Sequence, residues 1–377
     1  MGGKKHVVIQ NKSDKPDNVV EKEYEITTQC ENLERALPSF LRGYFAYLRG
    51  NVLPMTRLAY LQDITFFFNY LLDQPELTKA EKIGQITLEE LNKLKAFDIN
   101  VFIDYCRKYE KEGKNAVYVY ENSNKTLARK KSSISVMFKQ LYRDEMLDYN
   151  ITEKFNPIRL PKAQEREIKA LQDDEVMIML DAVSTGVGLT KKEHQYWEKT
   201  KKRDKAILII FLTYGLRLSE LQQLNVSSFN FRRGEFKIYR KRGKESIMPL
   251  NESVVSVLED YLYNERKQVE NEDALFLSLQ GTRMTDRQIR QLVKKYTSIC
   301  LNTSRRDGYS PHKLRATTAT SLIARGNSIF DVQALLDHEQ VTTTQLYASH
   351  KKNVKRDLVS EMEWEKERVE TLNKIKE

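Results

Sequence analysis

Two prolines near the middle of the chain interrupt its helical patterns. Pro157 and Pro161 lie in the segment 156–162, and a charged stretch over residues 164–169 follows. Proline lacks a backbone N–H and disfavours helix in the residue before it, so this stretch favours an extended path. Because 377 residues suffice for two hydrophobic cores, we predict two domains joined by a linker over residues 151–170.

The part before the linker has the apolar spacing of helices and no strand pattern. Apolar residues recur every three or four positions over 40–48 and again over 58–72, where Thr56 is the expected helix cap. Thr87 opens a Thr-x-x-Glu signal typical of a capping box. We therefore predict a compact helical domain over residues 37–150.

Polar and charged residues dominate both ends of the chain. Residues 1–36 predict an N-terminal extension, either a poorly ordered tail or a small accessory element. Residues 351–377 are charged with apolar residues only at intervals, which predicts a C-terminal helical tail with a narrow apolar face.

The part after the linker combines helices with one strand pattern. Residues 204–216 are nearly all apolar and predict a buried helix. Residues 229–250 alternate, with turn signals at Gly234 and Gly243, and predict two or three short antiparallel strands. The expected fold of the whole chain is mainly α with a small antiparallel β-sheet, and the second domain should span residues 171–350.

The charge of the chain favours polyanionic partners. The net charge is +10 and the pI about 9.2, and residues 125–143 hold six basic residues and no acidic one. This stretch predicts either a helix that faces a nucleic acid or an ordinary solvated helix face. The candidate nucleic-acid contacts are Lys125, Arg129, Lys130, Lys131, Lys139 and, further along, Lys244.

Other classes of protein are disfavoured. No apolar run approaches the roughly 18–20 residues needed to span a bilayer, and the first thirty residues lack the apolar core of a signal peptide. The three cysteines are far apart and odd in number, which predicts reduced thiols in a cytoplasmic protein and not a disulfide or zinc framework.

Three separated motifs carry residues suited to phosphate chemistry. Arg217 follows the buried apolar helix and a glycine, and its planar guanidinium suits two phosphate oxygens, although a structural ion pair with Glu220 is the alternative. His312 and Arg315 follow the helix-start pair Ser310-Pro311, so both lie near the positive end of a helix dipole. The alternative there is an ordinary capped helix with an exposed histidine.

The third motif ends the set. His338 follows an amphipathic stretch, and Tyr347 comes nine residues later. A tyrosine hydroxyl is a weak nucleophile until a base or nearby positive charge assists it. Lys241 and Lys244 lie in the turn of the strand pattern, where either could protonate a leaving oxygen, the alternative being a solvated basic turn.

The order and spacing of these motifs resemble the tyrosine recombinase (phage integrase) family. The resemblance covers residues 171–350 and extends more loosely over the helical domain. It implies a two-domain clamp on duplex DNA, a homo-tetramer on two recombination sites, and a tail that docks on a neighbouring protomer. It also implies that no cofactor, metal or ATP is needed, and it leaves room for accessory directionality or DNA-bending proteins.

The resemblance also implies a role for each matched residue. Arg217 and Arg315 would clamp the scissile phosphate, and Tyr347 would attack it to form a 3′-phosphotyrosyl bond. Lys241 would be the general acid, with Lys244 as a possible substitute, since the placement depends on counting back from Pro249. His312 would act as general base and His338 would hydrogen-bond the phosphate.

Three positions depart from the family pattern. Asp337 stands where glycine is usual, Ser246 where arginine is common, and Ala316 where histidine is frequent. Residues 180–203 form a longer polar connection than minimal members have, which together with residues 1–36 favours an integrase of a mobile element. The alternatives are Xer-like resolution of chromosome or plasmid dimers, a type IB topoisomerase, and a catalytically inactive DNA-binding regulator in which Asp337 spoils the site.

Overall fold

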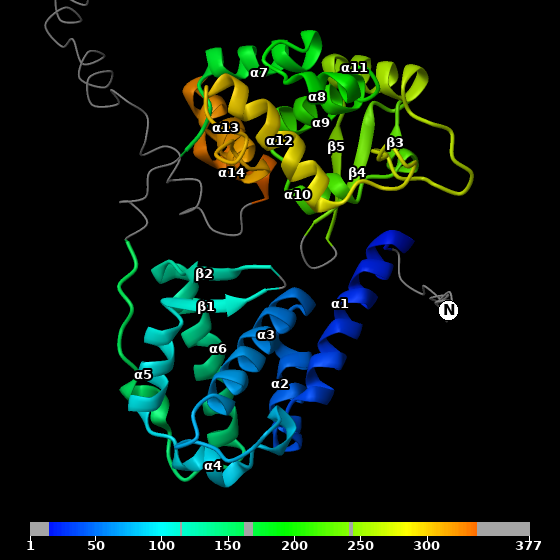
Figure 1. The fold of residues 1–377 in the computed structure, drawn as a ribbon. Coiled ribbons are helices and arrows are strands. Elements are labelled where there is room, and N and C mark those ends of the chain that lie inside the picture. Colours follow the sequence, from blue (N-terminus) through cyan, green and yellow to red (C-terminus); the bar gives the residue numbers. More distant parts are fainter. Residues whose placement is uncertain (1–14, 114, 162–168, 241–243, 338–377) are drawn as a thin grey trace, which may run out of the picture. The chain divides into compact units, whose positions relative to one another are not determined.

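The computed structural model describes residues 15–113, 115–161, 169–240 and 244–337. The chain divides into two compact units, Met1–Pro161 and Lys162–Glu377 (Figure 1). The division falls inside the stretch where the prolines predict a linker. Each unit has its own hydrophobic core.

The first unit is a bundle of helices around the long helices α3 and α6 (Figure 1). Its helices are α1 (Asp17–Ala36), α2 (Arg42–Asn51), α3 (Pro54–Leu72), α4 (Leu88–Lys93), α5 (Ala96–Tyr105) and α6 (Asn124–Arg143). Phe67, Phe102 and Phe138 come from three of these helices and pack edge to face, with ring centroids 5.0–6.3 Å apart. Their side chains are almost completely buried, so this aromatic cluster joins α3, α5 and α6.

Two helix starts differ from the predictions. Residues 17–36 form the 20-residue helix α1, which packs against α3. Oε1 of Glu34 on α1 forms an ion pair with Nη2 of the buried Arg57 at 2.7 Å. Much of the predicted extension is therefore part of the helical unit. Helix α3 begins at Pro54, which lies in the first turn, so Thr56 is inside the helix and does not cap it. The capping box of Thr87 and Glu90 is confirmed.

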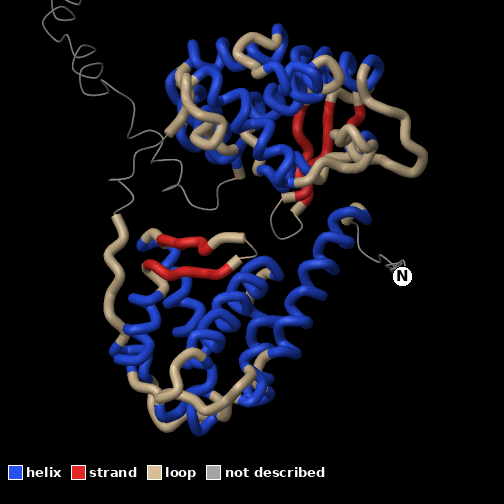
Figure 2. The backbone as a smooth tube through the Cα atoms, in the orientation of Figure 1, coloured by secondary structure: helices blue, strands red, loops and turns tan. Residues whose placement is uncertain are grey.

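The first unit also holds a β-hairpin, so the expectation of a unit without strands was wrong. Strands β1 (Lys108–Glu112) and β2 (Val117–Glu121) pair antiparallel (Figure 2). The side chains of β2 are all exposed, and Tyr109 stacks on Tyr120 with centroids 5.2 Å apart. A hairpin without a buried face lacks the one-sided hydrophobicity that marks most strands, which is why the pattern was missed.

The second unit surrounds the buried helix α9 with helices and places a small sheet at one end (Figure 1). Its helices are α7 (Asp173–Thr185), α8 (Lys191–Trp197), α9 (Lys201–Tyr214), α10 (Leu218–Gln222), α11 (Glu252–Asn264), α12 (Asp286–Cys300), α13 (Pro311–Ala324) and α14 (Ile329–Leu336). Helix α9 packs against α7, α11 and α13, and most of its apolar residues are buried, as the sequence predicts.

The small sheet confirms the predicted antiparallel strands. Its order is β3 (Phe229–Asn230), β4 (Glu235–Tyr239) and β5 (Glu245–Pro249). Phe236 and Ile238 of β4 point into the core while Lys237 points out. The positive φ of Gly234, +65°, forms the turn between β3 and β4, and such a φ favours glycine.

No helix in the described parts of the chain is long and apolar enough to cross a membrane. Cys30 and Cys106 are buried and Cys300 is half-buried, all as free thiols. Burial raises the pKa of Cys106 to about 12 and of Cys300 to about 11, so these thiols are poor nucleophiles.

Candidate active site

The end of the buried helix α9 positions the first predicted site residue. Gly215 ends the helix in the left-handed conformation, with φ +57°, and its N–H donates to Phe211. A Cβ at this position would lie 2.5 Å from Cδ2 of Leu336 and 3.4 Å from Cβ of Thr318. Glycine is therefore required both by the backbone and by the close approach of α13 and α14.

Arg217 is fixed by a carboxylate that the next helix buries. Its backbone N–H donates to Oε2 of Glu220 at 2.7 Å, and its Nη1 donates to Oε1 at 2.7 Å. The Glu220 side chain is 2% exposed, whereas that of Arg217 is 33% exposed. The ion pair that the sequence offered as an alternative is thus present, and it orients a guanidinium that still reaches solvent.

Helix α13 presents the second pair of predicted residues. It begins after Ser310 with Pro311 in its first turn, although the Ser310 side chain makes no capping hydrogen bond. His312 is exposed and Arg315 is buried, so the two side chains differ in environment despite their three-residue spacing. Small residues follow, and the Thr318 hydroxyl donates to the Leu212 carbonyl at 3.0 Å, which draws α13 close to α9.

The carbonyl end of α14 brings three arginines together. Its last backbone carbonyls have no partner within the helix, as at every helix end. Arg240 donates from Nη2 to the Leu335 carbonyl at 3.0 Å, and Arg217 donates from Nη2 to the Asp337 carbonyl at 3.1 Å. Between them, the Leu336 carbonyl accepts from Nη2 of Arg315.

These three consecutive carbonyls therefore anchor guanidinium groups from three different elements. Arg217 stands at the start of α10, Arg240 directly follows β4, and Arg315 belongs to α13. Arg315 is anchored twice, because its Nη1 also donates to the Gly215 carbonyl at 2.7 Å. The negative end of the α14 dipole stabilises the clustered positive charge.

The carboxylate of Asp337 lies close to the positive charges of this cluster. It ends α14 in the left-handed conformation, with φ +49°, which glycine adopts freely and aspartate tolerates. Lys244 donates to its Oδ1 at 3.2 Å. Burial would raise the pKa of this carboxyl, but the Lys244 hydrogen bond and the charges of Arg240 and Arg217 hold it below its usual range. Asp337 is therefore ionised at neutral pH.

Three predicted site residues, Lys241, His338 and Tyr347, lie outside the described residues. Lys241 directly follows Arg240 in the sequence, and His338 directly follows Asp337. The structure thus brings Arg217, Arg315 and the residues preceding Lys241 and His338 to one place, the carbonyl end of α14.

Two residues of this cluster were missed or undervalued by the sequence analysis. Arg240 was not singled out, although it continues the inward positions of Phe236 and Ile238 and is 5% exposed. A basic residue in an inward position of a strand is a detectable signal. Glu220 was considered only as a competing ion-pair partner, and it also orients Arg217.

The predicted DNA-contacting residues of α6 occupy different environments. Lys125 and Lys139 are exposed, as a DNA contact requires. Lys130 is 8% exposed and pairs with the buried Asp63 at 3.2 Å, which differs from the prediction of a solvent-facing lysine. Arg129 also pairs with Asp63. Lys131 donates to the Asn156 carbonyl at 2.6 Å.

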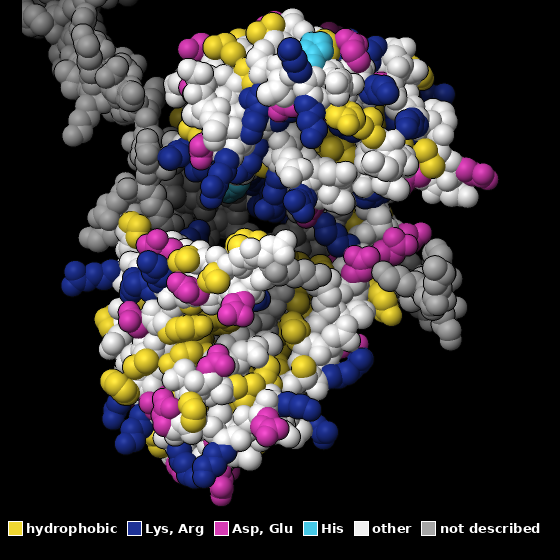
Figure 3. All heavy atoms as spheres, in the orientation of Figure 1, with side chains coloured by type: hydrophobic (Ala, Val, Ile, Leu, Met, Phe, Trp, Pro, Cys, Tyr) yellow, Lys and Arg dark blue, Asp and Glu magenta, His cyan; other side chains and the backbone are white. Residues whose placement is uncertain are grey.

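Basic side chains gather on the visible face of the second unit (Figure 3).

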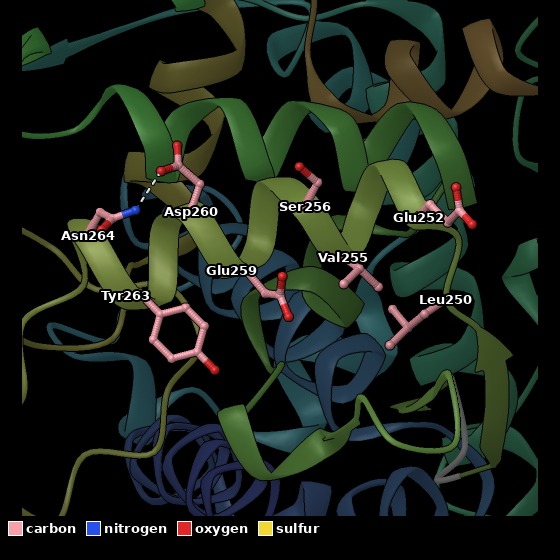
Figure 4. Close-up of a pocket in the computed structure, with 8 residues that line it drawn as sticks. All are labelled: Leu250, Glu252, Val255, Ser256, Glu259, Asp260, Tyr263 and Asn264. Carbon is pink, nitrogen blue, oxygen red and sulfur yellow. Dashed lines mark hydrogen bonds between the residues drawn. The ribbon is translucent and has the colours of Figure 1, made fainter.

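A separate hollow of about 550 Å³ lies along α11 and is lined by acidic side chains (Figure 4). Its walls include Glu252, Glu259 and Asp260, and Asn264 donates to Asp260 at 2.8 Å. Carboxylates repel phosphate, so this hollow is not the candidate DNA site. No group of three or more metal-ligating side chains occurs among the described residues.

Comparison with known proteins agrees with the geometry of the cluster. Residues 169–354 match the phage integrase family. Tyrosine recombinase XerC of Natranaerobius thermophilus is 33% identical over 317 residues, which are 81% of this chain and 92% of that relative. The chain belongs to the tyrosine recombinase family. It is accordingly an enzyme of the site-specific DNA recombinase class, a DNA strand transferase.

Solved structures of tyrosine recombinases share the fold of this chain. The XerH recombinase bound to a palindromic difH substrate matches 95% of this chain and 92% of its own, with a TM-score of 0.58 and 18% identity. The Tn1549 transposon integrase in complex with circular intermediate DNA matches 82% of this chain and 95% of its own, with a TM-score of 0.53 and 19% identity. These likenesses confirm the predicted fold class of a mainly helical, two-domain tyrosine recombinase.

Proposed function

We propose that this recombinase cuts and rejoins duplex DNA through a 3′-phosphotyrosyl intermediate formed by Tyr347. The observation that carries the proposal is the arginine cluster at the carbonyl end of α14. Arg217 and Arg315 are held by two neighbouring carbonyls at this helix end, those of Asp337 and Leu336, and Arg315 also by the Gly215 carbonyl. Guanidinium groups held in advance can stabilise the charge that develops on a phosphate in its transition state.

The proposed reaction balances without a co-reactant. The Tyr347 oxygen forms a bond to phosphorus while the bond from phosphorus to the 5′-oxygen breaks. The tyrosine proton passes to His312, and Lys241 donates a proton to the departing 5′-oxygen. A 5′-hydroxyl of the second strand reverses these steps, so the phosphodiester energy is conserved and rejoining needs no ATP.

We propose that the helical unit and the catalytic unit together clamp the DNA, with residues 37–150 and 171–350 as the two domains and helix α1 packed on the first of them. Exposed Lys125 and Lys139 on α6 would contact phosphates without selecting sequence. Four protomers would assemble on two sites, with residues 351–377 docking on a neighbour. Deleting residues 352–377 should then weaken assembly more than binding to a single site, and equal loss of both would count against the docking.

For the biological role, we propose resolution of chromosome or plasmid dimers as the first candidate and mobile-element integration as the second. The supporting observation is that the chain aligns with 92% of the length of a relative named XerC. Residues 1–36 favour a mobile element only as an extra segment, and residues 17–36 of it form a helix packed on α3 within the helical unit. The longer connection over residues 180–203 still favours integration, which remains the second candidate.

Covalent capture tests the proposed chemistry. Wild type and Tyr347→Phe are mixed with nicked genomic fragments of the source organism, in which a short 5′ fragment diffuses away after cleavage and prevents rejoining. An SDS-resistant protein–DNA adduct with wild type alone is expected. No adduct despite tight, salt-sensitive DNA binding would overturn the proposal in favour of an inactive DNA-binding regulator.

Sequencing the trapped DNA separates the two biological roles. One site per replicon, present also in strains that lack mobile elements, is the result expected for dimer resolution. Sites at the two ends of a mobile element, or at their joined circular form, would replace that role by integration and excision.

A further inference from the structure

Arg240 is buried in a way that ordinary stability does not explain. Its side chain is 5% exposed, and its Nε and Nη1 have no hydrogen-bond partner among the described residues. Leaving the donors of a buried charge unpaired costs free energy, more than for a neutral group. An unsatisfied buried group of this kind in a folded protein calls for an explanation other than stability.

The contacts that Arg240 does make join two parts of the catalytic unit. Its Nη2 donates to the Leu335 carbonyl of α14 at 3.0 Å and approaches the Met248 sulfur of β5 at 3.5 Å. Its backbone N–H donates to the Lys244 carbonyl at 2.8 Å, which closes the base of the β4–β5 turn. Arg240 thus ties the end of a hairpin to the end of a helix 95 residues later.

The two elements that Arg240 ties lead into two predicted site residues. The next residue after Arg240 is Lys241, and α14 ends at Leu336, two residues before His338. The hydrogen bond uses the carbonyl beside the one that holds Arg315. The hairpin is therefore hydrogen-bonded to the same helix end as Arg217 and Arg315, the arginines proposed to bind the phosphate.

We propose that Arg240 is a positioning residue, which sets the hairpin against the arginine cluster so that the lysine after it reaches the leaving 5′-oxygen. This inference rests on the proposed function, because it uses the roles assigned there to Arg217, Lys241 and Tyr347. A side chain that only contributed to folding would affect all steps of the reaction alike. A positioning role for the general acid affects proton donation above all.

Two matched DNA substrates distinguish these cases. Both contain the captured site with a nick, and they differ only in having oxygen or sulfur at the 5′ position of the scissile phosphate. A thiolate leaves without protonation, because its conjugate acid is far stronger than an alcohol, so the sulfur substrate does not need the general acid. Single-turnover cleavage is measured for wild type, Arg240→Met, Lys241→Ala, Arg217→Ala and Lys237→Met.

The expected pattern is specific. Arg240→Met should slow cleavage of the oxygen substrate by at least about tenfold while slowing the sulfur substrate by less than about threefold. Lys241→Ala should show the same difference between the two substrates, with a larger loss on the oxygen substrate. Arg217→Ala should slow both substrates alike. Lys237→Met is the matched control, since Lys237 lies on the same strand but points outward, and it should change neither rate.

Equal slowing of both substrates by Arg240→Met, or no slowing of either, would overturn the inference. If wild type cleaves neither substrate, the proposed function fails instead. A second measurement, amide hydrogen exchange of the protein without DNA, needs no activity. Arg240→Met should speed exchange in β4, β5 and the last turn of α14 and leave α7 unchanged, and unchanged exchange at the hairpin and α14 would also overturn the inference.

Discussion

Lys244 donates a hydrogen bond to the carboxylate of Asp337 across 93 residues of sequence, with 3.2 Å between Nζ and Oδ1. The lysine side chain is 67% exposed, so this ion pair contributes little to stability. Its importance is electrostatic, because it holds a negative charge beside the guanidinium groups of Arg217, Arg240 and Arg315, and we propose that Arg217 and Arg315 bind the phosphate.

Removing the charge of Asp337 should accelerate cleavage. Asn tolerates the left-handed conformation of this position, so Asp337→Asn keeps the fold while the site becomes more positive. We expect a rate increase of about threefold to tenfold in single-turnover cleavage, shrinking as salt is raised. Asp181→Asn, a charge change on the exposed side of α7, serves as control. An unchanged or lower rate for Asp337→Asn would mean that the acid assists the site.

Removing Glu220 should disorganise Arg217 and weaken the fold. The buried carboxylate accepts both the backbone N–H and the guanidinium of Arg217. Glu220→Ala should lower the free energy of unfolding by about 1–3 kcal/mol. Cleavage at a pH and temperature where the variant remains folded should fall by at least about tenfold.

Two variants sharpen this test. Glu220→Gln keeps an acceptor and should give intermediate values for both quantities. Glu198→Ala removes a glutamate from an exposed ion pair with Lys201 and should change neither by much. If Glu220→Ala were destabilised but cleaved DNA at the wild-type rate, the orientation of Arg217 by Glu220 would be unnecessary.

The close approach at Gly215 can be tested against a second glycine. Gly215 and Gly234 both have a positive φ, but a Cβ would strike Leu336 at Gly215 and meets nothing within 4 Å at Gly234. Gly234→Ala should therefore cost only the backbone term of about 1–2 kcal/mol. Gly215→Ala should cost about 1–3 kcal/mol more, because packing must also shift. Equal losses in urea denaturation would show that α14 yields without cost.

Acid should selectively remove a contribution of Glu193. Burial raises the pKa of this carboxyl, but the hydrogen bonds from Arg305 and Thr190 outweigh burial and lower the pKa to about 2. A lowered folded-state pKa stabilises the protein above the ordinary pKa of 4.5, and that stabilisation is lost as the pH falls toward 2. The stability difference between wild type and Glu193→Gln should therefore shrink over this range, as measured by urea unfolding. A constant difference would mean that the ion pair is not responsible.

Local patterns were sufficient for the elements with one buried face. The apolar run before Gly215 predicts α9, and the alternation on either side of Gly234 predicts the small sheet, because both reflect burial of a regular face. The same reasoning failed for Val117–Glu121, whose strand has no buried face. It also failed for residues 17–36, whose polar composition conceals a helix that buries few of its side chains.

The family and enzyme class of this protein can be read from its residues alone, because the residue types and spacing around Arg217, His312 and Arg315 are typical of tyrosine recombinases. How the arginines are held follows from the three-dimensional packing. The acceptors are backbone carbonyls of Leu335, Leu336 and Asp337, and every residue has such a carbonyl, so no side-chain pattern marks them. Their availability depends on where a helix ends and on which distant elements pack against that end.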